Sequence, residues 1–251
     1  AEVGEALLQN EQVDFYSFTG SVPVGERISE ASKLRGCALE LGNNSAVIVH
    51  DDVPNLEEAA AATVEDGFAN AGQVCISVQR VYVHENIYDQ FVAAMKERAE
   101  ELTVGDPGQE ETDIGPLIRK EEVPRIDSWV QDAVEAGAEL VTGGAPMEDK
   151  FYQPTILADA DHSMKVMKQE IFGPVIAVSP YSEVEEAIEK TNDSEYGLQA
   201  GIFTADMQRG LKAAQEIEAG GVIINDTASY RVDAMPYGGV KKSGIGKEGP
   251  K

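Results

Sequence analysis

Cysteine is scarce in this 251-residue chain, which contains only Cys37 and Cys75. Two cysteines are too few for a disulfide framework, so we expect a reducing, cytoplasmic setting. Residues 1–10 show no basic segment followed by an apolar stretch, and no apolar run reaches the roughly 20 residues that a bilayer span requires. We therefore expect neither a signal peptide nor a membrane protein.

Basic residues are also few, since 20 lysines and arginines stand against 45 aspartates and glutamates, for a formal charge of −25. Such a surface repels nucleic-acid phosphates and anionic lipids, so we expect no nucleic-acid partner and no membrane partner. Two explanations of the acidity stay open. The protein is either an ordinary acidic one, or it is adapted to high salt, where screening removes the repulsion between carboxylates.

Helical and strand-like segments alternate along the chain. The sequence predicts helices at residues 56–69, 86–102, 127–136, 183–190 and 206–219, and strands at 46–49, 78–83, 175–178 and 222–224. The strand segments are apolar without clean alternation, which is typical of strands covered on both faces. This pattern predicts an α/β fold with a mostly parallel sheet and helices on both faces.

Cys75 is the first candidate for chemistry, because it lies in the glycine-containing stretch Gly72-Gln73-Val74-Cys75 before a predicted strand. A cysteine in such a turn is accessible to substrate, and nearby backbone N–H groups can stabilise its thiolate. The alternative is a small buried hydrophobic residue. Cys37 has no motif around it, and we expect a buried core thiol there.

Glu40 is the second candidate, because its carboxylate lies in the apolar run Ala38-Leu39-Glu40-Leu41. Burial would raise its pKa towards neutrality, which suits a general base acting on water. The alternative is a carboxylate at a strand end that is satisfied by backbone N–H groups. The three histidines, His50, His84 and His162, are scattered along the chain, so we predict no metal site.

Five ordered motifs together resemble the aldehyde dehydrogenase superfamily. The motifs are Phe18-Thr19-Gly20-Ser21 with Gly25, Glu40-Leu41-Gly42, Gly72-Gln73-Val74-Cys75, Glu170-Ile171-Phe172-Gly173-Pro174, and Pro236-Tyr237-Gly238-Gly239-Val240-Lys241 followed by Ser243-Gly244. The resemblance implies oxidation of a small-molecule aldehyde to a carboxylic acid with NAD or NADP, in a homo-oligomeric parent enzyme. It implies that Cys75 forms a thiohemiacetal and then a thioester, which Glu40 helps to hydrolyse.

The resemblance also assigns cofactor contacts. Ser21, within a turn that precedes a helical stretch, would meet the cofactor phosphate, as a helix N-terminus with a hydroxyl can. Glu170 would hold the nicotinamide-side ribose, and Phe172 would lie beside the ring. The remaining predicted cofactor-binding residues are Gly20, Gly25, Leu41 and Gly42.

The chain departs from the family pattern in two ways. Asn43-Asn44 follow Gly42, where the family has a second glycine and a lysine. The N-terminal half of the family is also absent. We therefore expect residues 1–42 to be a remnant of the NAD(P)-binding domain, 43–241 the catalytic domain, and 242–251 a truncated C-terminal segment.

The activity of these residues, their use of a cofactor and the substrate stay open at this point. The 251 residues alone are expected to be inactive in oxidation. The alternatives are a catalytically silent domain that binds no dinucleotide, and a thiol esterase that uses Cys75 and Glu40 without a cofactor. Residues 226–239 resemble branches acting on glyceraldehyde 3-phosphate, lactaldehyde or succinate semialdehyde, and Arg231 there would pair either with an anionic substrate group or with a neighbour such as Asp233.

Overall fold

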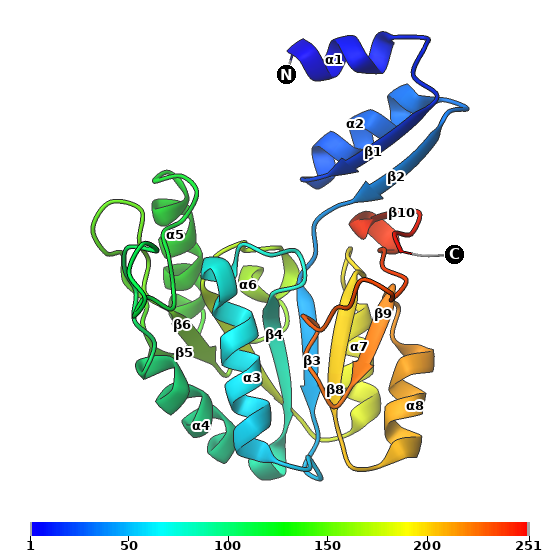
Figure 1. The fold of residues 1–251 in the computed structure, drawn as a ribbon. Coiled ribbons are helices and arrows are strands. Elements are labelled where there is room, and N and C mark those ends of the chain that lie inside the picture. Colours follow the sequence, from blue (N-terminus) through cyan, green and yellow to red (C-terminus); the bar gives the residue numbers. More distant parts are fainter. Residues whose placement is uncertain (1, 250–251) are drawn as a thin grey trace.

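The computed structural model describes residues 2–249 and contains two sheets (Figure 1). The larger sheet has seven strands in the order β5-β6-β7-β4-β3-β8-β9, and the smaller has three in the order β1-β2-β10. All neighbours in the larger sheet are parallel except the pair β5–β6. The mostly parallel sheet with helices on both faces confirms the predicted fold class.

The elements have the following bounds. The strands are β1 Phe15–Thr19, β2 Gly36–Glu40, β3 Ser45–Val49, β4 Val78–His84, β5 Glu139–Thr142, β6 Thr155–Ala158, β7 Val175–Tyr181, β8 Gln199–Phe203, β9 Gly221–Ile224 and β10 Gly244–Ile245. The helices are α1 Glu2–Gln9, α2 Val22–Ser32, α3 Leu56–Phe68, α4 Tyr88–Glu100, α5 Glu122–Glu135, α6 Lys165–Lys168, α7 Val184–Asn192 and α8 Met207–Glu216. Short 3₁₀ turns are η1 Ala69–Gly72, η2 Glu85–Ile87 and η3 Lys241–Ser243.

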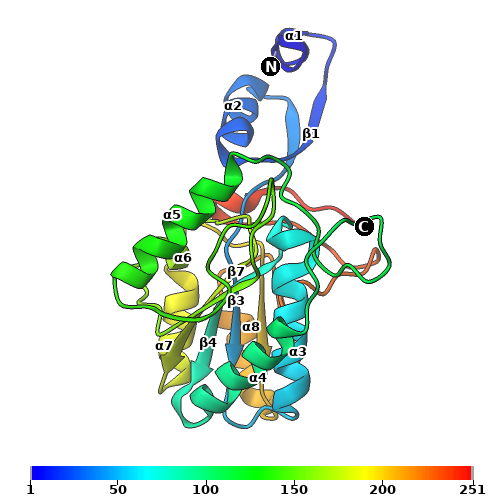
Figure 2. The same ribbon diagram turned by 90° about the vertical axis from the view of Figure 1, so that its left-hand side faces the viewer.

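Helices cover both faces of the larger sheet because its crossovers run in opposite directions. The connection from β3 to β4 moves towards one edge, whereas the connections from β7 to β8 and from β8 to β9 move towards the other. Right-handed crossovers then place α3 on one face and α7 and α8 on the opposite face. Figure 2 shows α3 and α4 on one side of the strands and α7 on the other. Every residue of β3 and β8 is buried, which explains why these strands lack polar alternation.

The smaller sheet has a hydrophobic cluster of its own. β1 and β2 are parallel, and β10 pairs antiparallel with β2, so the segment near residue 245 returns to the first part of the chain. Tyr16, Ile28, Leu39 and Leu41 are buried between this sheet and α2. Residues 1–42 supply α1, β1, α2 and β2, although the helices and strands predicted by residue range begin only at residue 46.

Two further expectations concern the burial of Cys37 and the absence of a membrane-spanning helix. Cys37 lies in β2 and packs against the hydrophobic cluster of the smaller sheet, but it is half-buried rather than fully buried as expected. Its neighbour in the strand, Leu39, is the residue that enters the core. Among the helices of residues 2–249, none combines the length and the apolar character needed to cross a membrane.

Candidate functional site

The predicted site residues meet where the two sheets join. Cys75 lies in the turn before β4, Asn43 precedes β3 and Glu170 precedes β7, so these three residues lie at the amino ends of neighbouring parallel strands. Glu40 is the last residue of β2 and enters this junction from the smaller sheet. Residues separated by as many as 130 positions are thus brought to one edge of the larger sheet.

The loop that presents Cys75 is shaped by unusual backbone conformations. Asn70 and Ala71 both have left-handed backbone angles, with φ of 51° and 56°. Such conformations cost about 1–3 kcal/mol each and cluster at functional sites. Gln73 holds the loop in place, because its Oε1 accepts the backbone N–H of Ile118 at 2.8 Å and its Nε2 donates to the Asn70 carbonyl.

The thiol of Cys75 is partly buried and lies beside a tyrosine. Its Sγ is 3.3 Å from the hydroxyl of Tyr237. Burial raises the pKa of Cys75, the carboxylates of Glu170 and Glu40 raise it further, and the hydrogen bond with Tyr237 opposes them. The backbone N–H of Cys75 also favours the thiolate, as predicted for this turn, but burial outweighs both hydrogen bonds. The thiol therefore needs a base before it attacks.

Tyr237 is a candidate that sequence reasoning did not single out. It lies inside the quoted motif Pro236–Lys241 but comes from the far end of the chain, and it is only 4% exposed. The guanidinium of Arg231 lies over its ring at 4.1 Å. Arg231 pairs with Glu248 at 3.0 Å, so its neighbour is not Asp233.

The carboxyl group of Glu40 is buried and incompletely paired. The residue is 5% exposed, and its buried Oε2 has no hydrogen-bond partner among residues 2–249. Burial raises the pKa of Glu40 to about 7, the carboxylate of Glu248 adds to this rise, and Arg231 opposes it. Backbone N–H groups therefore do not satisfy Oε2, contrary to the alternative interpretation of this carboxylate. A carboxyl group with this pKa can exchange a proton with water near neutral pH.

Glu170 is fixed by the backbone that follows β2. Its Oε1 accepts the N–H of Asn43 at 2.9 Å, and a Cβ at Gly42 would lie 2.7 Å from Oε2. Burial raises the pKa of Glu170 to about 7, while Asn43 and Arg125 oppose the rise. Asn43, which replaces a glycine of the family pattern, contributes its backbone to this contact.

Phe172 projects from the same loop in a strained conformation. Its φ is 47°, and its side chain is 40% exposed. Buried Gln79 holds the loop from below, because its Oε1 accepts the N–H of Ile171 at 3.0 Å and its amide donates to Gln169. The aromatic ring is thus held out from the surface at the edge of the junction.

The glycine–serine turn begins α2. Ser21 is the N-cap residue, yet its hydroxyl makes no capping hydrogen bond. Gly20 donates its N–H to the Glu40 carbonyl at 3.0 Å, which ties the turn to the end of β2. Gly25 allows α2 to approach Leu41, because a Cβ there would overlap both methyl groups of that leucine.

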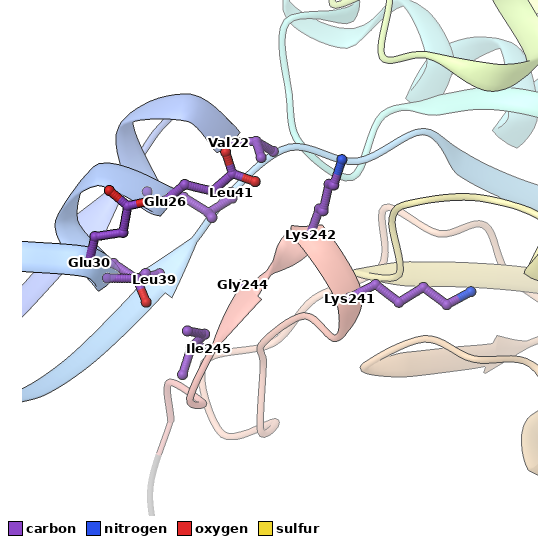
Figure 3. Close-up of a pocket in the computed structure, with 11 residues that line it drawn as sticks. Val22, Glu26, Glu30, Leu39, Leu41, Lys241, Lys242, Gly244 and Ile245 are labelled. Atoms are coloured by element: carbon purple, nitrogen blue, oxygen red, sulfur yellow. The ribbon is translucent and has the colours of Figure 1, made fainter. Parts of the chain in front are cut away.

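Gly25 and Leu41 also line a cavity of about 470 Å³ between α2 and the segment of η3 and β10 (Figure 3). Lys241 and Lys242 lie on one wall, where they pair with Glu218 and Glu195. The α2 wall carries the carboxylates of two further glutamates, Glu26 and Glu30. These carboxylates disfavour a pyrophosphate inside the cavity.

The predicted cofactor residues fit a nicotinamide dinucleotide at the junction itself. An uncommitted hydroxyl at the N-terminus of the 11-residue helix α2 suits a phosphate group. The absent Cβ of Gly42 leaves Glu170 Oε2 room to meet a ribose hydroxyl. These two local features, at Ser21 and at Glu170, are compatible with contacts to a dinucleotide.

The histidines are not all scattered as expected. His50 and His84 lie side by side, with ring centroids 4.8 Å apart, whereas His162 contacts Tyr82 and Asp193 elsewhere. The pair of His50 and His84 lies outside the junction, at the opposite ends of β3 and β4 from Asn43 and Cys75.

Comparisons with known proteins identify the family. The model of the aldehyde dehydrogenase family matches residues 1–251, and the chain belongs to that family. It is 57% identical over its whole length to the 3-sulfolactaldehyde dehydrogenase of Priestia aryabhattai, of which it covers 52%. The chain spans about half the length of the curated relatives it matches.

Two solved structures show the same architecture. The glyceraldehyde-3-phosphate dehydrogenase of Methanocaldococcus jannaschii, complexed with NADP, superimposes with a TM-score of 0.94 at 44% identity, over 98% of this chain and 53% of that one. The aldehyde dehydrogenase of Mycobacterium tuberculosis, complexed with NAD+, gives 0.93 at 39% identity, over 99% and 52%.

Proposed function

We propose that the protein containing this chain oxidises an aldehyde to a carboxylic acid with NAD or NADP, with Cys75 as nucleophile and Glu40 as general base. The observation that carries the proposal is the buried, unpartnered Oε2 of Glu40, in the same junction as the Cys75 thiol. Family membership and the structures of relatives that hold NAD+ or NADP support the reaction class.

The chain's own groups account for bond formation and cleavage at sulfur. The ionised Glu40 takes the thiol proton, and Sγ of Cys75 adds to the aldehyde carbon to form a thiohemiacetal. The backbone N–H of Cys75 donates to the oxygen that becomes negative. When bound, NAD or NADP would accept the hydride that leaves the thiohemiacetal carbon while the oxygen loses its proton to water, which leaves a thioester on Cys75. Glu170 and Phe172 would hold the nicotinamide end.

Hydrolysis of the thioester uses the same carboxylate again, after Glu40 has released the thiol proton to solvent. Glu40 removes a proton from water, the resulting hydroxide adds to the acyl carbon, and the C–S bond breaks to release the acid and the Cys75 thiolate. Because the pKa of Glu40 is raised to about 7, the carboxyl group both accepts and returns protons near neutral pH.

Acylation by an activated ester tests the two assignments without a dinucleotide. With p-nitrophenyl acetate, we expect wild-type protein to turn over and Cys75→Ser to give no acylated protein. Glu40→Gln should acylate more slowly than wild type, through the small thiolate fraction present at pH 8, and should then retain one acetyl group by intact mass because the base for hydrolysis is missing. Cys37→Ser is the matched thiol control and should behave like wild type. Turnover of Glu40→Gln at the wild-type rate would exclude Glu40 as the base, and acylation of Cys75→Ser would exclude the nucleophile.

The cofactor assignment needs a separate measurement. Calorimetric titration with NAD and with NADP should show binding that Glu170→Gln weakens. If the protein acylates and deacylates but binds neither dinucleotide, the thiol esterase interpretation replaces the dehydrogenase. If it does neither, the silent-domain interpretation holds.

For the substrate, we propose a small aldehyde that carries an anionic group. Arg231 contacts the ring of Tyr237, which contacts Cys75, and an anionic substrate would replace Glu248 as its partner. The printed names of two relatives concern 3-sulfolactaldehyde and glyceraldehyde 3-phosphate, both of which are anionic. Arg231→Gln should raise KM for an anionic aldehyde far more than for a neutral one of equal size, and equal effects would exclude the assignment.

The remaining proposals concern organisation. We propose that residues 1–42 belong to a cofactor-binding part, 43–241 to a catalytic part and 242–251 to a C-terminal segment. We also propose a cytoplasmic homo-oligomer acting on a small-molecule aldehyde. The two unpaired cysteines support the compartment, and the exposed apolar side chains of Phe15 and Ile245 on the smaller sheet support self-association. Sedimentation that gives only monomer would exclude the assembly.

A further inference from the structure

A second cluster of reactive side chains lies at the opposite end of the larger sheet. His50 directly follows β3, and His84 is the last residue of the neighbouring strand β4. Both residues are 8% exposed, and their rings lie 4.8 Å apart. β4 has seven residues, so the length of a strand, roughly 20 Å, separates this cluster from the turn of Cys75.

His50 directs a ring nitrogen towards two carboxylates. Its buried Nδ1 lies 2.8 Å from Asp51 Oδ1 and 3.4 Å from Asp52 Oδ1, but within residues 2–249 neither contact has the direction of a good hydrogen bond. A buried polar atom without a partner costs free energy, and in native structures it calls for a specific explanation. A cation between the ring nitrogen and the carboxylate would use both lone pairs.

The neighbouring groups leave one carboxylate for such a cation. Arg209 pairs with Asp52 at 2.7 Å and neutralises it. Asp51 has no such cation, but its Oδ2 accepts the side-chain N–H of Asn86 at 2.8 Å. That bond orients the carboxylate with Oδ1 towards His50, as partners of metal-bound carboxylates usually do.

The topology of the sheet also favours a ligand at this place. The crossovers that follow β3 and β4 lie on one face of the larger sheet, and those that follow the flanking strands β7 and β8 lie on the other face. The carboxyl ends of strands at such reversals form the usual ligand crevice of open α/β sheets. Tyr181, at the end of β7, closes one side with its ring 5.4 Å from that of His84.

We propose that His50, His84 and Asp51 bind one divalent transition-metal ion, with Zn²⁺ as the best-matched ion. Two imidazoles and one carboxylate are a donor set that suits Zn²⁺ and neighbouring metals rather than Mg²⁺ or Ca²⁺. The site lies outside the junction, and it holds whether or not the proposed dehydrogenase function does.

The geometry needs only a small adjustment. The three ligand atoms lie within 4.8 Å of one another, whereas ligands about 2.1 Å from a tetrahedral Zn²⁺ are about 3.4 Å apart. His50 Nδ1 and Asp51 Oδ1, now 2.8 Å apart, must separate, while the more distant ligand atoms must approach, and side-chain rotation at the exposed Asp51 allows the first change. His84 Nδ1 now accepts the backbone N–H of Asn86 at 3.2 Å. Because Asn86 is exposed, water can accept that N–H when His84 Nδ1 binds the metal.

The test is calorimetric titration with Zn²⁺ of the 251-residue chain carrying Cys37→Ser and Cys75→Ser, so that no thiolate competes for metal. Excess Mg²⁺ is included to occupy surface carboxylates. We expect one Zn²⁺ to bind per chain. With Co²⁺ in place of Zn²⁺, we expect the intense visible absorption of a four-coordinate site and no thiolate charge-transfer band.

Variants decide whether the bound ion is at this site. His50→Gln, His84→Gln and the exposed Asp51→Asn should each abolish the stoichiometric binding, and Asn86→Ala should weaken it about 10–100-fold. His162→Gln is the matched control and should bind as the parent does. Circular dichroism identifies any variant that fails to fold. If the histidine variants do not fold, binding of Zn²⁺ by Asp51→Asn decides whether the ion is at this site. Absence of one-to-one binding, or binding that survives these variants, would overturn the proposal.

Discussion

At the residue scale, the local pattern predicts which groups are candidates, but the fold decides their protonation. Cys75 and Glu40 can be chosen from their own neighbours in the sequence. Tyr237 cannot, because its contact with Cys75 joins residues 162 positions apart. The direction of the pKa shift of Cys75 likewise depends on Glu170 and on burial, which a glycine-containing turn does not indicate.

Tyr237 should control the reactivity of Cys75 through the thiol pKa. Tyr237→Phe removes the hydrogen bond that opposes the rise in the pKa of Cys75, so the pKa should rise further. With Cys37→Ser as background, we expect iodoacetamide to alkylate Cys75 about three- to tenfold more slowly at pH 8, because one pKa unit is tenfold in thiolate.

The full pH profile separates this role from a structural one. The alkylation rate at saturating pH should be nearly unchanged in Tyr237→Phe, while the midpoint moves to higher pH. Tyr230→Phe is the control, because Tyr230 is 47% exposed. An unchanged midpoint would contradict the role, and a lower rate at all pH values would indicate a misplaced loop.

The buried carboxyl of Glu40 should make stability depend on pH. Its folded-state pKa of about 7 lies above the reference value of 4.5, so the folded protein binds this proton more tightly than the unfolded chain. The stabilisation is therefore fully present below about pH 4.5 and is lost as the pH rises through about 7. Glutamine resembles the protonated form at every pH.

Between pH 5 and pH 8, the free energy of unfolding of wild type should fall by about 1–3 kcal/mol more than that of Glu40→Gln. This range is already reduced to allow for solvent penetration. Urea unfolding at the two pH values measures the change. Glu110→Gln, at an exposed position, is the control and should show no such difference. A constant difference between Glu40→Gln and wild type at both pH values would show that Glu40 titrates normally.

At the scale of elements, periodic helices and fully apolar strands are predictable, and interrupted ones are not. The helices predicted at residues 56–69 and 206–219 correspond to α3 and α8 within a few residues. α5 begins at Glu122, five residues before the predicted start, because Pro124 occupies its first turn, where no intrahelical N–H is needed.

β8 was not predicted, and its glycine explains why. Gly201 weakens the strand pattern, yet a Cβ there would lie 2.5 Å from the Asp226 carbonyl oxygen, so the close approach of another backbone requires glycine. β1 and β2 depend on each other and on β10. Contacts between distant segments, which the sequence pattern does not show, therefore determine the parts of the fold nearest the candidate site.

Glycine substitutions should have opposite effects in two elements. Gly72 has φ of 68°, and a Cβ there would overlap the carbonyl oxygen of Gly173. Gly72→Ala should therefore separate the Cys75 loop from the Glu170 loop and cost about 2–4 kcal/mol. Gly4→Ala, in α1, meets nothing within 4 Å and should be neutral or gain up to about 1 kcal/mol.

Unfolding in urea measures both glycine effects, and the rate of Cys75 alkylation reports on the loop. Gly72→Ala should change the alkylation rate, and Gly4→Ala should leave it as in wild type. If the two substitutions change stability equally, the close contact between the two loops does not constrain the site.

At the scale of the whole molecule, charge dominates. The formal charge of −25 is spread over a chain of 251 residues, and most of the ion pairs that the structure shows lie at the surface. Exposed ion pairs contribute little, about 0–1 kcal/mol each. They therefore do not offset the mutual repulsion of the excess carboxylates, which opposes the compact state.

Salt should relieve that repulsion if the acidity is an adaptation. Charges interact over about 10 Å at 0.1 M salt but only about 3 Å at 1 M, so molar KCl removes repulsion between all but adjacent carboxylates. We expect the melting temperature to rise steadily from low to molar KCl. A neutral osmolyte at equal osmolality is the control, because it strengthens burial without screening charge. An equal rise in both solutes would assign the effect to exclusion from the surface, and a flat or falling melting temperature in KCl would identify an ordinary acidic protein.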